Sequence, residues 1–189
     1  MVFPNPLKLL IHPFNFFDEL KSKNGTLTAF IYYFFISLFS SVIPLIKYFI
    51  IVNIEFYRSY LYLSPVSNPI LVFLGLLFLS FIIAVIFHLF VSLIGGKKKF
   101  SDSYKIFAYS STPLLVIYPI IDLIFPLDIV YPGFGIFYYC IFGLYFAYLF
   151  FLGFYKIYEL SKVKLVLLII FGIIFYIVLT IIGMMISFR

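Results

Sequence analysis

The residues most able to do chemistry are two glycines followed by three lysines, within the stretch SLIGGKKKFSDSYK at residues 92–105. A phosphate-binding P-loop needs glycine, four residues, and then glycine-lysine followed by serine or threonine. Here Lys98 follows Lys97, and Val91 stands where the first glycine would be. The stretch also follows a long apolar run instead of a short strand. The spacing therefore excludes a P-loop.

The same stretch is typical of a connection between two membrane helices. Gly95 and Gly96 can adopt the left-handed conformation that ends a helix, and cations suit the negative carboxyl end of that helix. Three short polar residues are candidate caps for the next helix: Ser101, Asp102 and Ser103. Three basic residues form a candidate contact for anionic lipid or an acidic protein: Lys97, Lys98 and Lys99.

Two ionisable residues lie in apolar runs, where such residues are functional candidates by default. His88 is expected about 12 Å from the helix end at Gly96, at about 1.5 Å per residue. It is predicted either to act in a membrane pathway or to hydrogen-bond a neighbouring helix as a neutral imidazole. Asp122 is expected near the outer interface, about 26 Å along its span from Lys105. A small transporter or channel using His88 and Asp122 is the alternative function.

The sequence carries no recognisable catalytic or metal site. Its two histidines, His12 and His88, do not form a His-Glu-x-x-His motif, and no carboxylate pair lies within one apolar run. The one cysteine, Cys140, lies in an apolar run, which excludes a disulfide framework and a cysteine metal site. We therefore expect no enzyme activity, no cofactor and no bound metal.

Composition indicates which elements position these residues. The 189 residues are 65% hydrophobic and 11% charged, whereas soluble domains are roughly 45–50% apolar and about 25% charged. The excess apolar surface must face lipid, so we predict an all-α integral membrane protein with five spans of about 20 residues. After a lead at 1–26, the predicted spans form one membrane domain at 27–187: 27–52, 69–94, 104–125, 134–154 and 165–187.

The distribution of positive charge orients the chain. The net charge is +6, and for a membrane protein the anionic bilayer surface is a better partner than nucleic acid. With the N-terminus in the cytoplasm, ten of the 13 lysines and arginines fall on the cytoplasmic side and three on the other. Cytoplasmic loops normally carry such an excess. We therefore predict a cytoplasmic N-terminus and an outside C-terminus.

The lead contains a candidate interfacial segment, PFNFFDELKSKNG at 13–25. Phe14, Phe17 and Leu20 recur every three residues, which suits a helix lying in the membrane surface. An ordinary juxtamembrane segment is the other interpretation. Phe14 and Phe17 join the three lysines as the predicted cytoplasmic interaction face.

Small and polar residues four apart mark a predicted helix contact in the second span. Membrane helices associate through close packing of such residues, because lipid tails are as apolar as leucine. The stripe is therefore expected to face a neighbouring helix. Its four members are Ser80, Ala84, His88 and Ser92.

A series of motifs along residues 9–187 resembles one family. HLFVSLIGGKKKF at 88–100 is followed by YSSTP at 109–113, which contains Tyr109 and Pro113. In these motifs the chain resembles the Yip family of five-span proteins, which is named for interaction with Ypt/Rab GTPases. The resemblance implies five spans, a cytoplasmic N-terminus and no enzyme activity. In eukaryotic members it implies trafficking and membrane-shaping roles in Golgi or ER membranes, with Rab partners.

Two departures separate this sequence from the eukaryotic members. Their long cytosolic N-terminal region and their acidic-Leu-Tyr-Gly-Pro stretch are missing from it. It resembles instead a short prokaryotic-type member in the cell membrane, so Rab binding is not carried over. We expect a non-enzymatic scaffold that organises the membrane, or a platform that binds lipid or protein at the cytoplasmic face.

Overall fold

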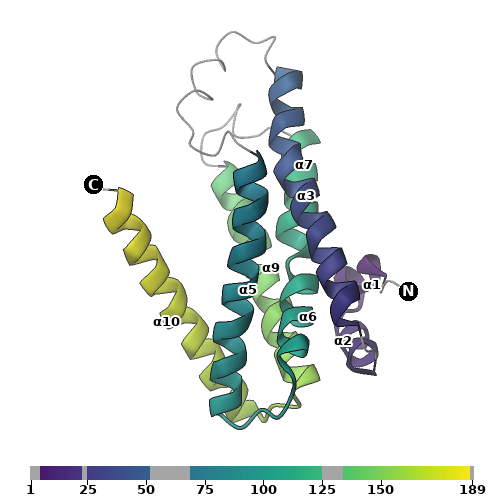
Figure 1. Ribbon diagram of the computed structural model, residues 1–189, viewed down its shortest axis with the longest axis vertical. Helices are drawn as coiled ribbons and strands as arrows, with labels where there is room; N and C mark the ends of the chain where they lie inside the picture. The colour runs from purple at the N-terminus through teal and green to yellow at the C-terminus, as the bar shows by residue number, and fades with distance from the viewer. Residues whose placement is uncertain (1–4, 23–24, 52–68, 125–133, 188–189) are drawn as a thin grey trace.

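The computed structural model describes residues 5–22, 25–51, 69–124 and 134–187, and within these ranges the chain is helical with no strand. Figure 1 shows an elongated bundle, with the connections at 94–99 and 158–161 together at one end. This is the basic end, which carries Lys97, Lys98 and Lys99. In chain order the helical segments are α1 Pro6–Ile11, α2 Pro13–Ser22, α3 Thr26–Ile51, α5 Pro69–Leu93, α6 Phe100–Ser110, the π-helical η3 Pro113–Ile117, α7 Tyr118–Ile124, α9 Phe134–Ile157 and α10 Lys162–Ser187.

Five of the described helical stretches are long and apolar enough to cross a membrane, which confirms the predicted all-α architecture. The third is continuous from Phe100 to Ile124 through α6, η3 and α7. It begins before residue 104, the predicted start, and α10 begins at Lys162 instead of 165. Hydropathy detects the apolar part of a span, whereas the helix itself continues into the headgroup layer, where charged residues are solvated.

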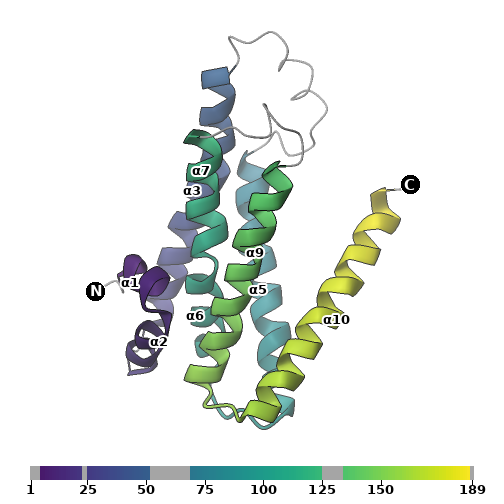
Figure 2. The ribbon, with the colours of Figure 1, turned by 180° about the vertical axis from the view of Figure 1, so that it is seen from behind.

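The helix α6 forms the centre of the bundle. It contacts α3, α5 and α9, and its residues from Ser103 to Ser110 are all buried. Figures 1 and 2 show it beside α3, α5 and α9. The third span is therefore the one around which the first, second and fourth spans pack.

Pro113 changes the helical hydrogen bonding where α6 ends. Proline has no N–H, so the carbonyl of Tyr109, four residues earlier, loses its usual donor. The Thr112 hydroxyl donates to that carbonyl at 2.6 Å, and the Tyr32 hydroxyl of α3 lies 2.6 Å from the Thr112 oxygen. The five residues Pro113–Ile117 are π-helical. The YSSTP motif thus supplies both the proline and the hydroxyl that compensates for it.

The predicted segment at 13–25 contains a helix, α2, which packs against α9. Phe16 and Phe17 are buried, and Phe16 meets Tyr109 edge-on with ring centres 5.4 Å apart. A Cβ on Gly153 of α9 would lie 2.9 Å from Phe17, so the missing side chain makes room for the ring. The sequence assigns Phe17 to the predicted interaction face, and in the structure its side chain is completely buried, so it contributes no accessible surface there. Sequence periodicity shows that a helix has an apolar side but not whether lipid or protein covers it.

The predicted small-residue stripe of α5 turns away from the bundle along the helix. A step of four residues advances the helix by about 40° beyond a full turn. His88 is accordingly only half-buried, although its ring still reaches Ser103 of α6. Ser92 is exposed, so the stripe ends after its third member. The buried positions alternate steps of four and three, which keeps them on one side: Ser80, Ala84, Phe87 and Val91.

The last helix, α10, is attached along its first half and then diverges. Its Phe171 ring stacks on Phe90 of α5, with ring centres 4.0 Å apart and planes 6° apart. Phe175 meets Phe87 edge-on at 5.9 Å. Both ribbon views show the rest of α10 leaning away from α5 and α9 (Figures 1 and 2). Its outer part therefore presents apolar side chains to lipid.

The two glycines end α5 as a Schellman turn. Gly95 has φ +87°, and its N–H donates to the Ser92 carbonyl at 3.0 Å. The Gly96 N–H donates to the Val91 carbonyl at 2.8 Å, which completes the pattern. A Cβ on Gly96 would lie 2.4 Å from the Val91 side chain and 2.9 Å from the Tyr158 ring. Gly95 is needed for its backbone conformation and Gly96 for close packing.

Gly96→Ala should destabilise the protein, because the added methyl has no space between Val91 and Tyr158. Overpacking of this kind costs about 1–3 kcal/mol. Thermal unfolding of purified protein in a mild detergent measures the change. Gly143→Ala is the matched control, since a Cβ there meets nothing within 4 Å and should alter stability by no more than about 1 kcal/mol. Equal effects of the two substitutions would contradict this packing role.

Candidate functional site

An open groove lies at the basic end of the bundle, with a volume of 780 Å³. Its walls come from the end of α2, the first turn of α3, the connection between α5 and α6, and the first turns of α6. Five lysines face one carboxylate in the described lining, so the groove favours anions. The lining residues are Lys21, Gly25, Thr26, Leu27, Thr28, Lys97, Lys98, Lys99, Ser101, Asp102 and Lys105.

The three consecutive lysines lie in the extended connection that follows the glycine turn. Lys97, Lys98 and Lys99 are all exposed. Lys99 occupies the N-cap position of α6 and provides no side-chain cap. The predicted capping by Ser101, Asp102 or Ser103 is therefore wrong, because the helix begins before them. An N-terminus without a side-chain acceptor adds its own partial positive charge to the groove wall.

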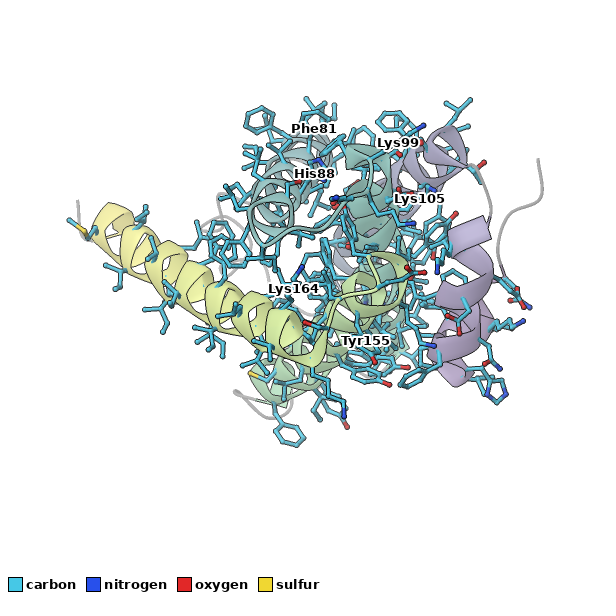
Figure 3. All side chains as sticks on the ribbon, turned by 90° about the horizontal axis from the view of Figure 1, so that it is seen from below. Phe81, His88, Lys99, Lys105, Tyr155 and Lys164 are labelled. Atoms are coloured by element: carbon cyan, nitrogen blue, oxygen red, sulfur yellow. The ribbon has the colours of Figure 1, made fainter. Side chains whose placement is uncertain are left out.

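Lys105 lies deeper than the other lysines of the groove. Its residue exposure is only 4%, and its ammonium lies 2.8 Å from Oδ1 of Asp102, one turn earlier. A buried ammonium requires such a partner, since an uncompensated charge is costly to bury. Figure 3 shows Lys99 and Lys105 on the same side of the bundle. The sequence shows only that Lys105 lies one helical turn after Asp102. It does not predict that Lys105 lines the groove.

Lys21 reaches the groove from α2, 76 residues before Lys97 in the chain. Its ammonium forms an ion pair with Glu159, in the turn after α9. Glu159 has φ +52°, and the next N–H, of Leu160, bonds the Tyr155 carbonyl at 3.2 Å. This is a second Schellman turn, with glutamate in the usual place of glycine. The hydrogen bond from Lys21, with its charge, holds the pKa of Glu159 below its usual value.

A polar cluster lies beside the groove and joins α5, α6 and the end of α9. The His88 Nδ1 lies 2.9 Å from the Tyr158 hydroxyl and 3.2 Å from the Ser103 hydroxyl, and those two hydroxyls also bond each other. Burial raises the pKa of Tyr158 to about 12, so its phenol stays neutral near pH 7. This arrangement matches the interpretation of His88 as a hydrogen-bonding residue between helices.

The structure does not bring His88 and Asp122 together. Asp122 lies in α7, which Figure 1 shows toward the end of the bundle opposite the basic end. His88 lies near the basic end, against Ser103 of α6. Neither residue lines the lysine groove. The pair therefore offers no observed support for the transporter alternative.

The predicted interaction face is divided between two places. Phe14 is 48% exposed, but the Lys156 ammonium lies 5.2 Å above its ring and 2.8 Å from an Asp18 oxygen. These contacts fasten α2 to α9, and Phe14 does not line the groove. The three predicted lysines lie in the groove with Lys21 and Lys105, which sequence reasoning did not assign to it.

The comparison with known families is consistent with this geometry. A family model described as the Yip1 domain matches residues 7–184, which include every lining residue of the groove. No curated protein matches the chain, and no solved structure does so. The family match confirms the resemblance that the histidine, glycine and proline motifs indicated.

Tyr158→Phe should destabilise the protein, because His88 and Ser103 lose a shared hydrogen-bonding partner in a buried position. The expected loss is about 1–3 kcal/mol in unfolding free energy. Tyr176→Phe, at a position 71% exposed on α10, is the matched control. Thermal unfolding in detergent compares the two variants. A Tyr158→Phe protein as stable as the control would contradict a structural role for the cluster.

Proposed function

The chain belongs to the Yip1 domain family, and on that premise we propose that it is a non-enzymatic membrane scaffold that binds anionic headgroups. The family is not known for enzymatic activity. The lysine groove carries the proposal, because it gathers five ammonium groups from segments far apart in the chain. Binding of anionic lipid there would recruit such lipids around the bundle, which is one way for a small protein to organise a bilayer.

The level of the groove relative to the membrane supports a lipid ligand over a soluble one. Thr26 lines the groove, and Phe100 directly follows Lys99, which also lines it. Both Thr26 and Phe100 are the first residues of spans. The groove is therefore expected at the level of the headgroups. Lysine side chains at this level attract anionic lipids by about 1 kcal/mol each.

The side of the membrane follows from the charge asymmetry and is part of the proposal. Lys97, Lys98 and Lys99 belong to the basic segments that the positive-inside rule assigns to the cytoplasm. We therefore place the groove at the cytoplasmic face of a cell membrane. The five apolar helices support a multi-pass protein.

Replacing Lys97, Lys98 and Lys99 together by glutamine should weaken binding of phosphatidylglycerol at least tenfold, because each lysine contributes about 1 kcal/mol. The salt dependence of binding should fall as well, since fewer charges are neutralised. The measurement is a titration of purified full-length protein in neutral detergent with phosphatidylglycerol micelles, at two salt concentrations.

The matched control removes three other positive charges of the protein: Lys8, Lys162 and Lys164. None of the three lines the groove, so this variant should keep most of the binding. If both triple variants lose affinity equally, net charge and not the groove explains binding. If the groove variant keeps full affinity and salt dependence, the proposed function is wrong.

A further inference from the structure

A strip of aromatic rings extends from the groove into the apolar layer. Phe30 stacks on Tyr104 with ring centres 6.3 Å apart, Tyr104 meets Phe100 at 6.5 Å, and Phe100 meets Phe81 at 5.3 Å. The strip crosses α3, α6 and α5 in that order. Its two ends, Phe30 and Phe81, are 47% and 54% exposed. Tyr104 between them is buried, so the strip presents apolar surface beside the groove mainly at its two ends.

The strip and the groove share the same side of the bundle. Phe30 lies three and four residues after Leu27 and Thr26, so it shares their face of α3, and both line the groove. Phe100 directly follows Lys99. Figure 3 shows Phe81 and Lys99 on one side of the bundle and Tyr155 on another.

The strip also continues to a depth that acyl chains occupy. Phe81 lies seven residues before His88 on α5, about 10 Å further from the basic end at about 1.5 Å per residue. The charged groove and the Phe81 end of the strip therefore follow one another along the membrane normal, as do the headgroup and tails of a lipid.

The donors of the groove favour a phosphomonoester over a phosphodiester. Lys21 and the first turn of α3 approach from one side, and the lysine connection and α6 approach from the other. A phosphomonoester presents three oxygens and carries a charge of about −1.5 to −2, so donors on both sides can reach it. A phosphodiester has two free oxygens and one charge. With five lysines and one aspartate in the described lining, the doubly charged group compensates more of the positive charge.

We propose that the groove holds the phosphomonoester headgroup of a single lipid, of the phosphatidic acid class, whose two acyl chains lie against the exposed rings at the ends of the strip, Phe30 and Phe81. The inference rests on the proposed function, because it names the lipid that the same groove would select. Lys105, at 4% exposure, provides the deep charge that the headgroup approaches, and its partner Asp102 limits how far the phosphate enters. Lys97, Lys98 and Lys99 close over the headgroup from the connection.

The headgroup is tested with purified full-length protein in neutral detergent, titrated with dioctanoyl phosphatidic acid or dioctanoyl phosphatidylmethanol. These probes differ by one methyl group, which removes the second charge. The expected result is binding of phosphatidic acid at least about fivefold tighter, equivalent to one lysine contact. Equal affinities would overturn the inference and leave general anionic binding intact. Binding of neither probe would overturn the proposed function as well.

The acyl strip is tested with Phe81→Ala against Phe137→Ala, a matched control on α9, outside the strip, at 59% exposure. Phosphatidic acid binding should fall about threefold or more in the first variant and stay unchanged in the second. Equal effects would contradict a role of the strip in binding the acyl chains.

Glycerol 3-phosphate distinguishes a lipid ligand from a soluble phosphate ester, because it has the same phosphate and no chains. If it binds as tightly as dioctanoyl phosphatidic acid, the lipid assignment is wrong.

Discussion

The contact between two helix ends, at Gly96 and Tyr158, is the constraint on which the basic end of the protein depends. In lipid, helices gain no hydrophobic energy by meeting, so their association depends on close packing and internal hydrogen bonds. Here the missing side chain of Gly96 admits the Tyr158 ring, and the phenol then reaches His88 and Ser103. Three helices are joined at one point, and the lysine connection starts from that point.

Most of the fold followed from composition and hydropathy, because spans must be long, apolar and helical to satisfy their backbone in lipid. Five spans and the turn at Gly95 were predictable for that reason. Whether lipid or protein covers a given side of each helix was not predictable. Phe17 and Phe14 have the same residue type and lie on one short helix, yet one is buried against α9 and the other is half-exposed. Apolar residues suit lipid and protein equally, so the sequence could not distinguish them.

The groove was predictable only where its residues are consecutive. Lys97, Lys98 and Lys99 are visible as a cluster in the chain, whereas Lys21 and Lys105 join them only after α2 has packed on α9 and α6 has entered the bundle. Glu159 shows the same limit. Its nearest lysines in sequence lie three residues away, but it pairs with Lys21, since its left-handed backbone conformation and the packing of α2 decide where its carboxylate points.

The attachment of α10 along its first half only has a mechanical consequence. The helix has 26 residues and is about 39 Å long at about 1.5 Å per residue, which exceeds the hydrocarbon core of about 30 Å. A longer apolar helix fits a bilayer by tilting, and the ring contacts of Phe171 and Phe175 act as a hinge about halfway along it. A thinner bilayer would increase the lean of α10 and widen the protein in one leaflet only. The cross-section of this small bundle is thereby coupled to the thickness of the membrane that surrounds it.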